Sequence, residues 1–299
     1  MGIERILTAA PILWLVSACV PNHPTRTVRP DVPIAPWAER TVRSASSGAT
    51  YRYLHLDGPA PGAPAMLLLP GGFYDARIFL NMADLARRFE VYALDWPDSC
   101  AAYTGHVNDY GDVAADFLSA VGVRELYVGG VSMGTYGAID LVSRKKELDV
   151  RGLVLLSTVM FGVDEREVSH RERMSRAGLR LGPEKMRALI EVSVRRAKYE
   201  RAPGAVQQDE IFWVRPYSYY LQVFSMMGNQ GAQRQATREI RCPTLLLQGD
   251  DDEVMPVALA RLSPGAFEDA KYVEIPGGAH SMIFSRGPEL AKMILDFFL

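Results

Sequence analysis

Residues 126–134 read LYVGGVSMG, an apolar run that ends in a Gly-x-Ser-x-Gly pattern. The run has the composition of a buried strand, and a helical pattern follows it. A serine on so sharp a turn from strand to helix has a strained backbone, and side chains two positions away would clash, so Gly130 and Gly134 suit the turn. The turn lifts the Ser132 hydroxyl above the sheet and places the Met133 N–H at a helix start, where the helix dipole favours negative charge. The stretch therefore predicts a reactive serine at a strand end.

Short apolar runs recur along the chain, at 65–69, 91–94, 126–129, 153–157, 244–248 and 272–275. Their hydrophobicity is continuous rather than alternating, which is typical of strands buried on both faces of a parallel sheet. Helical patterns lie between them, for example at 113–121 and at 290–297, where Pro288 is expected in the first turn. The alternation predicts an α/β fold, a mostly parallel central sheet with helices on both faces. Residues 41–43 and 51–56 are expected to add a leading antiparallel hairpin.

One long segment, 162–237, has no strand-like run and carries helical stripes. We expect it to form a helical lid insertion over the carboxyl edge of the sheet. Residues 164–201 within it carry eleven basic and seven acidic side chains, a surplus of +4. This surplus could be a solvated helix face, or it could attract an anionic lipid or an acidic substrate. The aromatic and methionine side chains of 212–227 suit an apolar pocket wall, but also the lid's own core.

A serine hydroxyl needs a base to become a nucleophile, and the base is most often histidine. The chain has five histidines, and only His170 and His280 follow Ser132. His170 falls in the predicted lid, whereas His280 lies in the glycine-rich loop 277–281, directly after the last predicted strand. An imidazole on that loop can reach a serine on a central strand, so His280 is the predicted base.

An acid must orient that imidazole and stabilise its cation. Residues 249–256, GDDDEVMP, follow the strand predicted at 244–248 and offer three adjacent aspartates. Three neighbouring aspartates cannot all serve, and the others are expected to be solvated or to cap turns.

The Ser132 turn, the acidic loop and the late histidine together resemble the α/β-hydrolase superfamily, over roughly residues 50–299. The resemblance implies that family's fold with its helical lid. Because the acid loop of the family often reads G-x-x-D-x-x-x-P, it also implies Asp252 as the catalytic acid, with Asp250 and Asp251 as alternatives.

The same resemblance points to an oxyanion hole. Residues 70–73, Pro-Gly-Gly-Phe, resemble the family's His-Gly-x loop, with Pro70 at or near the usual histidine. The Phe73 N–H would then join the Met133 N–H around a developing oxyanion, with Gly72 as the alternative donor. Asp95, in a further segment that resembles the family, is expected to be structural.

The N-terminus is predicted to be a lipoprotein signal peptide, residues 1–18, with a short apolar core. Val-Ser-Ala before Cys19 resembles a bacterial lipobox, which implies that Cys19 is acylated and becomes the first residue. An ordinary signal peptide or an uncleaved anchor is the alternative. Val20 after the cysteine favours the outer membrane, facing the periplasm. The proline-rich residues 19–40 are expected to be a tether, and 41–299 the folded domain.

Composition excludes several other classes. The chain has 299 residues, 48% of them hydrophobic and 23% charged, which is ordinary for a folded protein and not for a disordered one. A net charge of −2 gives no basic surface for nucleic acid. No metal-ligand cluster, phosphate loop or dinucleotide fingerprint occurs in the sequence, so no metal and no cofactor is predicted. Cys100 and Cys242 could oxidise after export, but we expect two unpaired buried thiols.

These patterns favour a serine hydrolase that cleaves a carboxylic ester, thioester or amide through an acyl-enzyme on Ser132. Its partner would be a small acyl substrate, with an acyl chain of short to medium length. An acyltransferase or a perhydrolase would use the same three residues, and a non-catalytic, ligand-binding lipoprotein is the alternative outside enzymes. Ester hydrolysis rests on analogy with the family and not on the residues alone.

Overall fold

The computed structural model describes residues 26–98, 109–158, 173–196, 201–227 and 236–299. Within these ranges one sheet holds eight strands: β1 (Ala38–Arg43), β2 (Thr50–Leu56), β3 (Ala65–Leu69), β4 (Glu90–Leu94), β5 (Glu125–Val131), β6 (Asp149–Leu156), β7 (Thr244–Gly249) and β8 (Ala270–Ile275). Their order is β1-β2-β4-β3-β5-β6-β7-β8. The β1–β2 and β2–β4 pairs are antiparallel, and every other pair is parallel. The predicted strands and the leading hairpin are confirmed.

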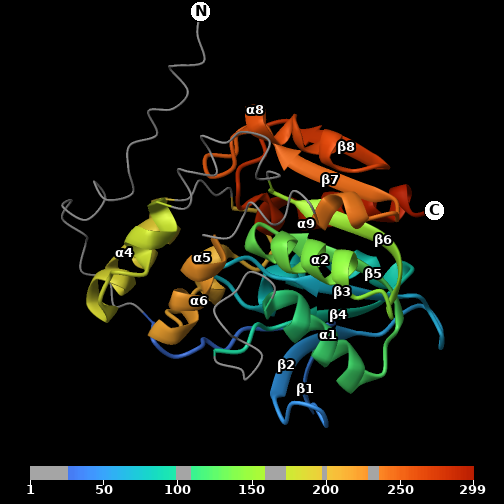
Figure 1. The fold of residues 1–299 in the computed structure, drawn as a ribbon, viewed down its shortest axis with the longest axis horizontal. Coiled ribbons are helices and arrows are strands. Elements are labelled where there is room, and N and C mark those ends of the chain that lie inside the picture. Colours follow the sequence, from blue (N-terminus) through green and yellow to red (C-terminus); the bar gives the residue numbers. More distant parts are fainter. Residues whose placement is uncertain (1–25, 99–108, 159–172, 197–200, 228–235) are drawn as a thin grey trace, which may run out of the picture.

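Each buried strand sends alternate side chains into two separate cores. On β3, Leu67 and Leu69 pack with α1 (Asp109–Val121) and α2 (Met133–Arg144), which contact each other across one face (Figure 1). Met66 and Leu68 pack on the other face with η3 (Ala76–Arg87) and α9 (Met282–Phe297). Since helices cover both faces, β3 and β7 are buried at every position and leave none at which a side chain faces water, which explains their continuous apolar runs.

The last helix differs from the prediction at its start. We expected Pro288 in its first turn, but α9 begins at Met282. The backbone leaves helical angles at Arg286 (φ −122°, ψ 19°), so a second helical segment starts there and holds Pro288 in its first turn. Proline lacks the N–H and clashes with the carbonyl four residues back, which accounts for the kink.

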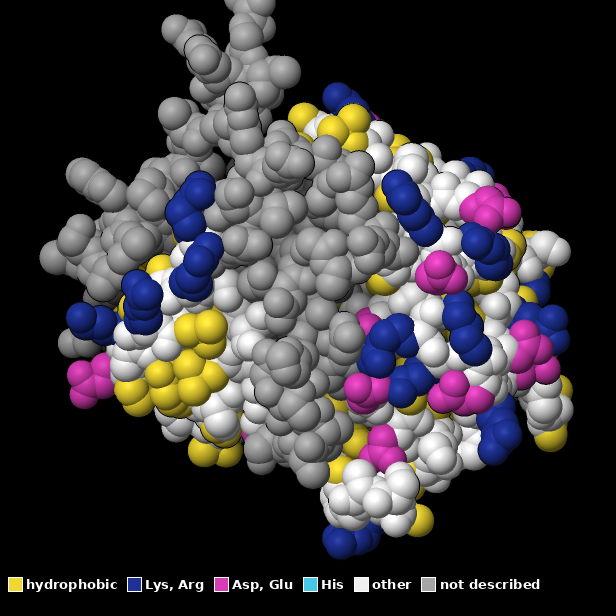
Figure 2. All heavy atoms as spheres, viewed as in Figure 1, with side chains coloured by type: hydrophobic (Ala, Val, Ile, Leu, Met, Phe, Trp, Pro, Cys, Tyr) yellow, Lys and Arg dark blue, Asp and Glu magenta, His cyan; other side chains and the backbone are white. Residues whose placement is uncertain are grey.

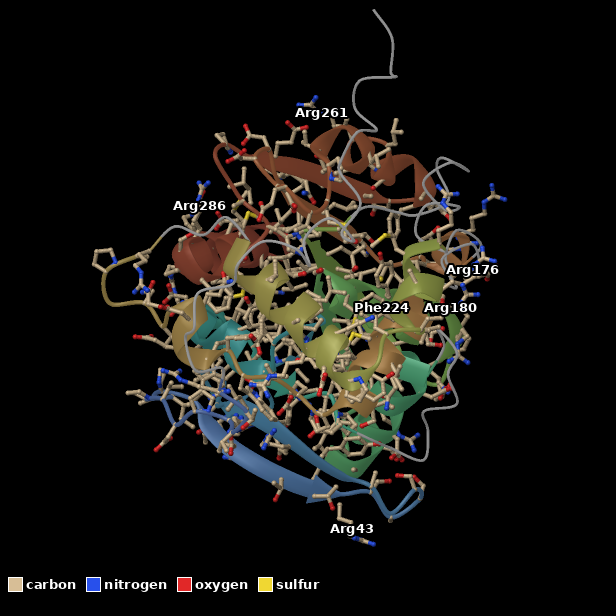
Figure 3. All side chains as sticks on the ribbon, turned by 90° about the vertical axis from the view of Figure 1, so that its left-hand side faces the viewer. Arg43, Arg176, Arg180, Phe224, Arg261 and Arg286 are labelled. Carbon is tan, nitrogen blue, oxygen red and sulfur yellow. The ribbon has the colours of Figure 1, made fainter. Side chains whose placement is uncertain are left out.

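Between β6 and β7 the chain forms the lid, which has a short helix at 173–178 followed by α4 (Pro183–Arg196), α5 (Gln208–Ile211) and α6 (Tyr217–Met227) (Figure 1). The stripe predicted on α4 is buried at Met186, Leu189 and Ile190. Basic side chains of 173–187 are exposed at this end of the molecule (Figure 2). Figure 3 shows Arg176 and Arg180 at the outer edge, and Phe224 further inside.

A buried arginine fastens the lid to the sheet. Arg215, directly before α6, donates to Asp95 at the end of β4 (3.0 Å) and to Asp98 (2.7 Å). Its guanidinium also lies over the Tyr219 ring, 4.4 Å from the ring centroid. Asp95 also accepts two hydrogen bonds from Arg52 of β2. Asp95 therefore ties the lid to the sheet, in keeping with the structural role expected for it.

The segment before β1 is extended but lies on the domain. The Arg26 carbonyl accepts the Val214 N–H of the lid (2.9 Å), and Trp37 is buried and donates to the Leu80 carbonyl of η3 (3.2 Å). The sheet starts at Ala38, inside the predicted tether, so the tether can include only the part of 19–40 that precedes Arg26. Residues 1–25 lie outside the described residues, and none of the described helices is long and apolar enough to cross a membrane.

The two cysteines of the domain were expected to be buried, unpaired thiols. Cys242 is unpaired, as expected, but partly exposed rather than fully buried. Burial nevertheless raises the pKa of its thiol to about 11, so it is protonated at neutral pH. Cys100 lies outside the described residues.

Candidate active site

Ser132 occupies a strained turn between β5 and α2. Its backbone has φ 50° and ψ −116°, a conformation that is energetically unfavourable for any residue with a side chain. The flanking glycines are required by space. A Cβ on Gly134 would lie 2.0 Å from the Leu69 carbonyl oxygen, and one on Gly130 would lie 2.6 Å from the Gly134 carbonyl carbon. The chain can therefore hold Ser132 at the end of the strand only with glycine at both positions.

His280 reaches Ser132 from the loop between β8 and α9. Its Nε2 lies 3.0 Å from the Ser132 Oγ, although 148 residues separate the two. The loop passes close to the end of β7, where a Cβ on Gly249 would lie 2.0 Å from the Gly278 carbonyl oxygen. Gly277 has φ 69°, in the left-handed region that favours glycine. This glycine-rich loop thus lets two neighbouring strand ends approach closely enough to bring His280 over the serine.

Asp252 faces the other nitrogen of the same imidazole. His280 Nδ1 lies 2.9 Å from Asp252 Oδ2 and 3.1 Å from Oδ1. The carboxylate is 0% exposed and accepts the Val254 and Met255 N–H groups (2.9 and 2.7 Å). When Nδ1–H donates to this carboxylate, Nε2 is left to accept the serine proton.

The other two aspartates of the acidic loop are turned elsewhere. Asp250 is exposed and accepts the Gly277 N–H (2.6 Å), and Asp251 is exposed as well. The hydrogen bond from the Gly277 N–H to Asp250 joins the acidic loop to the histidine loop, so Asp250 has a structural role. Of the three aspartates, the structure brings Asp252 against His280.

The glycine turn after β3 lies beside the serine. A Cβ on Gly71 would lie 3.5 Å from the Ser132 Cβ, and one on Gly72 would lie 3.1 Å from the Met133 Sδ. Met133 is the first residue of α2, so its N–H has no partner within the helix. Among the described residues, no acceptor takes the Phe73 N–H. The two predicted amides therefore lie on the two segments that border Ser132.

Sequence reasoning missed a second serine at the site. Ser157 follows β6, is buried and has φ 50°. Within the described ranges, Ser132 and Ser157 are the two non-glycine residues with positive φ. Ser157 Oγ donates to the His280 carbonyl (3.2 Å) and its N–H donates to the Leu247 carbonyl (2.9 Å). It holds the backbone of the histidine loop. A polar residue at the end of an apolar run was its signal in the sequence.

The residues of the site are those of a nucleophilic centre built on a serine. In the described part of the chain, no three histidine, cysteine, aspartate or glutamate side chains are grouped so as to hold a metal ion. The arrangement can take a proton from Ser132 onto His280, hold the resulting cation against Asp252, and offer amide N–H groups to a negative oxygen.

Comparison with known proteins identifies the family. The model of the alpha/beta hydrolase family matches residues 66–293, and the chain belongs to this family. The chain therefore has the α/β-hydrolase fold, with an eight-stranded, mostly parallel sheet and flanking helices. Monoacylglycerol lipase abhd6-A of Xenopus laevis is 22% identical over 277 residues, which cover 84% of this chain and 80% of that protein.

Solved structures share the fold at low identity. A membrane phospholipase A, described as a bacterial virulence factor, has a TM-score of 0.63 and 22% identity, covering 88% of this chain and 86% of its own. A thermophilic esterase from Thermogutta terrifontis has a TM-score of 0.68 and 18% identity, covering 87% of this chain and 97% of its own. At these identities the likeness concerns the fold.

Proposed function

We propose that the protein is a serine hydrolase that cleaves a carboxylic ester through an acyl-enzyme on Ser132. The observation that carries the proposal is the continuous contact from Ser132 Oγ through the His280 imidazole to the buried Asp252 carboxylate. Three residues from three loops meet in the order that lets a hydroxyl lose its proton to a base held in one tautomer.

The proposed reaction has two halves. His280 Nε2 takes the Ser132 proton while Oγ attacks the ester carbonyl, and the Phe73 and Met133 N–H groups stabilise the tetrahedral oxyanion. His280 then gives its proton to the departing alcohol, which leaves an acyl group on Ser132. Water attacks this acyl group with His280 as base, and His280 then returns the proton to Ser132 Oγ as the acyl–oxygen bond breaks and the acid is released. Asp252 stabilises the imidazolium in both halves.

An ester is preferred to a thioester or an amide because of the relatives. The names of two of them, an esterase and a monoacylglycerol lipase, refer to ester substrates. An acyltransferase or a perhydrolase on the same residues would differ only in the molecule that attacks the acyl group. A ligand-binding protein without catalysis is less well supported, because a binding site has no need of a serine held in strain against a histidine.

Pre-steady-state hydrolysis of p-nitrophenyl esters tests the proposal. Wild type should release a burst of p-nitrophenol close to one equivalent per site, and Ser132→Ala should give none. Esters of increasing chain length define the acyl preference. If added alcohol or peroxide captures most of the acyl group in competition with water, the acyltransferase or perhydrolase reading replaces hydrolysis. Steady hydrolysis that Ser132→Ala leaves unchanged would contradict the proposal.

We also propose that Cys19 carries lipid and holds the domain at a membrane, in keeping with the lipobox-like Val-Ser-Ala-Cys. Arg26 is fixed to the lid, and the seven Cα-to-Cα steps from Cys19 to Arg26 span roughly 25 Å at most. The lid would therefore lie within that distance of the bilayer. Metabolic labelling with an alkyne fatty acid, followed by separation of the two membranes, tests the anchor. Cys19→Ala should abolish both the label and outer-membrane fractionation, and retention of both would contradict it.

A further inference from the structure

Gln248 is a buried amide at the end of an apolar strand. β7 runs through Leu245, Leu246 and Leu247 and then carries Gln248, whose side chain lies in the interior (1% exposed). A buried polar side chain is unfavourable unless its groups find partners. The partners of this amide show what the residue does.

The amide nitrogen of Gln248 contacts the candidate acid. Nε2 donates to Asp252 Oδ2 at 2.8 Å and to the Met255 carbonyl at 3.0 Å. The opposite orientation of the amide would set Oε1 against these two acceptors, so the donor must face the carboxylate. Asp252 Oδ2 is also the oxygen nearer to His280 Nδ1, at 2.9 Å. One amide thus touches the oxygen that holds the imidazole.

The other end of the amide, Oε1, finds no partner in the part of the chain that the structure describes. Gln248 Oε1 is buried and, among the described residues, accepts no hydrogen bond. An orphaned buried acceptor lowers stability, so packing does not explain a polar side chain at this position. A role in fixing the carboxylate accounts for a glutamine at this position, whereas packing alone does not.

We infer that Gln248 is a positioning residue that fixes Asp252 for its contact with His280. The inference rests on the proposed function of the site. The Val254 and Met255 amides hold Oδ1, and Gln248 holds Oδ2, so the plane of the carboxylate is set before His280 binds to it. Without Gln248, Oδ2 faces the imidazole alone, the carboxylate can rotate, and more negative charge remains on that oxygen.

The ionisable groups around this amide are few. Asp252 and His280 belong to the site, and the Glu253 carboxylate accepts the His280 N–H at 3.3 Å. On β8, Glu274 stands opposite Gln248 in the register but is paired with Arg261. A change in the pH profile of a Gln248 variant therefore reports the Asp252–His280 pair.

Two variants test the inference, with Thr244→Val as a control for a buried polar residue at the other end of β7. Gln248→Leu should lower kcat/KM about tenfold, the value of a hydrogen bond to a charged group. The acidic limb of its pH profile should move to higher pH, because the more negative Oδ2 holds the imidazolium more tightly. Its Tm should fall modestly, because Asp252 Oδ2 and the Met255 carbonyl lose a donor, a cost that removal of the orphaned oxygen offsets only in part. Thr244→Val should keep the wild-type profile.

Gln248→Glu keeps the shape of the side chain but replaces the amide donor with a carboxylate, which accepts hydrogen bonds. At neutral pH two carboxylates would meet and activity should fall. As the pH drops, the introduced carboxyl gains a proton and becomes a donor again, so the ratio of variant to wild-type activity should rise. Wild-type pH profiles for both variants, in an enzyme that still requires Ser132, would overturn the inference.

Proton NMR of the His280 Nδ1–H gives a readout that does not depend on turnover. Its downfield resonance should shift in Gln248→Leu and stay in place in Thr244→Val. An unmoved resonance in Gln248→Leu would overturn the positioning role. If the wild type showed no hydrolase activity but the resonance still shifted in Gln248→Leu, the proposed function would be contradicted and the positioning of Asp252 would remain supported.

Discussion

The carboxylate of Asp75 and the guanidinium of Arg77 face each other at 2.6 Å, and each side chain is at most 1% exposed. Arg29, from the segment before the sheet, donates to Asp75 at 3.1 Å, and so does the Trp213 indole of the lid. Arg77 in turn donates to the Ile211 carbonyl at the end of α5 (3.1 Å). One buried ion pair therefore joins the N-terminal segment, η3 and the base of the lid.

Asp75→Asn should lower the free energy of unfolding by about 3–5 kcal/mol, because it leaves the buried Arg77 without a counter-charge. Burial alone would raise the pKa of Asp75, but its hydrogen bond to Arg77 and the charges of Arg77 and Arg29 outweigh burial and hold the pKa well below its usual range. A depressed folded pKa stabilises the protein at all pH values above the unfolded pKa of about 4 and loses this effect as the pH falls further.

Urea unfolding between pH 3 and pH 8 measures this difference. The gap between wild type and Asp75→Asn should be constant above about pH 5 and shrink towards pH 3. Asp57→Asn is the matched control, because the Asp57 side chain is 87% exposed and 3.9 Å from Arg40. A gap no larger than that of Asp57→Asn would contradict the role given to the buried pair.

Gly134→Ala should prevent the serine turn from forming. The new methyl group would lie 2.0 Å from the backbone oxygen of Leu69, which cannot move without distorting β3. We expect a loss of roughly 3 kcal/mol or more in stability, and loss of burst activity in any folded fraction. Gly182→Ala is the control, because no atom of the described residues, other than its two chain neighbours, lies within 4 Å of an added Cβ. Calorimetry and the burst assay compare the two, and wild-type behaviour of Gly134→Ala would refute the steric account.

Two variants of Ser157 separate the effect of its backbone strain from the effect of its hydrogen bond to the His280 carbonyl. Ser157→Ala and Ser157→Gly both lose the bond to the His280 carbonyl, so each should lower kcat by roughly fivefold. Ser157→Gly should be the more stable of the two by about 1 kcal/mol, because glycine adopts φ 50° without penalty. Thermal unfolding and steady-state kinetics measure both effects. Equal stability of the two variants would show that the positive φ stores no strain.

The sheet could be predicted from the sequence because its strands are covered on both faces, which leaves continuous apolar runs such as 65–69 and 153–157. The N-terminal segment could not be placed. Its proline content indicates extended chain, but the partners of Arg29 and Trp37 lie 46 and 43 residues further along. Contacts of that range leave no periodic signal in the sequence.

Within the site, too, features with a local sequence signal could be predicted, whereas features that depend on long-range contacts could not. Ser132 and His280 are marked by glycines close by in the chain, since tight turns and close approaches need them. Asp252 could be separated from its neighbours only through the resemblance to a family. Ser157 had a local signal, a polar residue at the end of an apolar run, but that signal does not show its contact with the His280 carbonyl 123 residues away. Gln248 had a local signal, a polar residue in an apolar run, but that signal does not say which group the amide meets.

The most direct test of the whole account is covalent labelling with a fluorophosphonate, which reacts with a serine activated by a neighbouring base. Wild type should take up one label per chain, located by peptide mass spectrometry on Ser132. Asp252→Asn should label more slowly, and Ser132→Ala should not label at all. Equal labelling of wild type and Ser132→Ala, or a label mapped to another residue, would contradict the account.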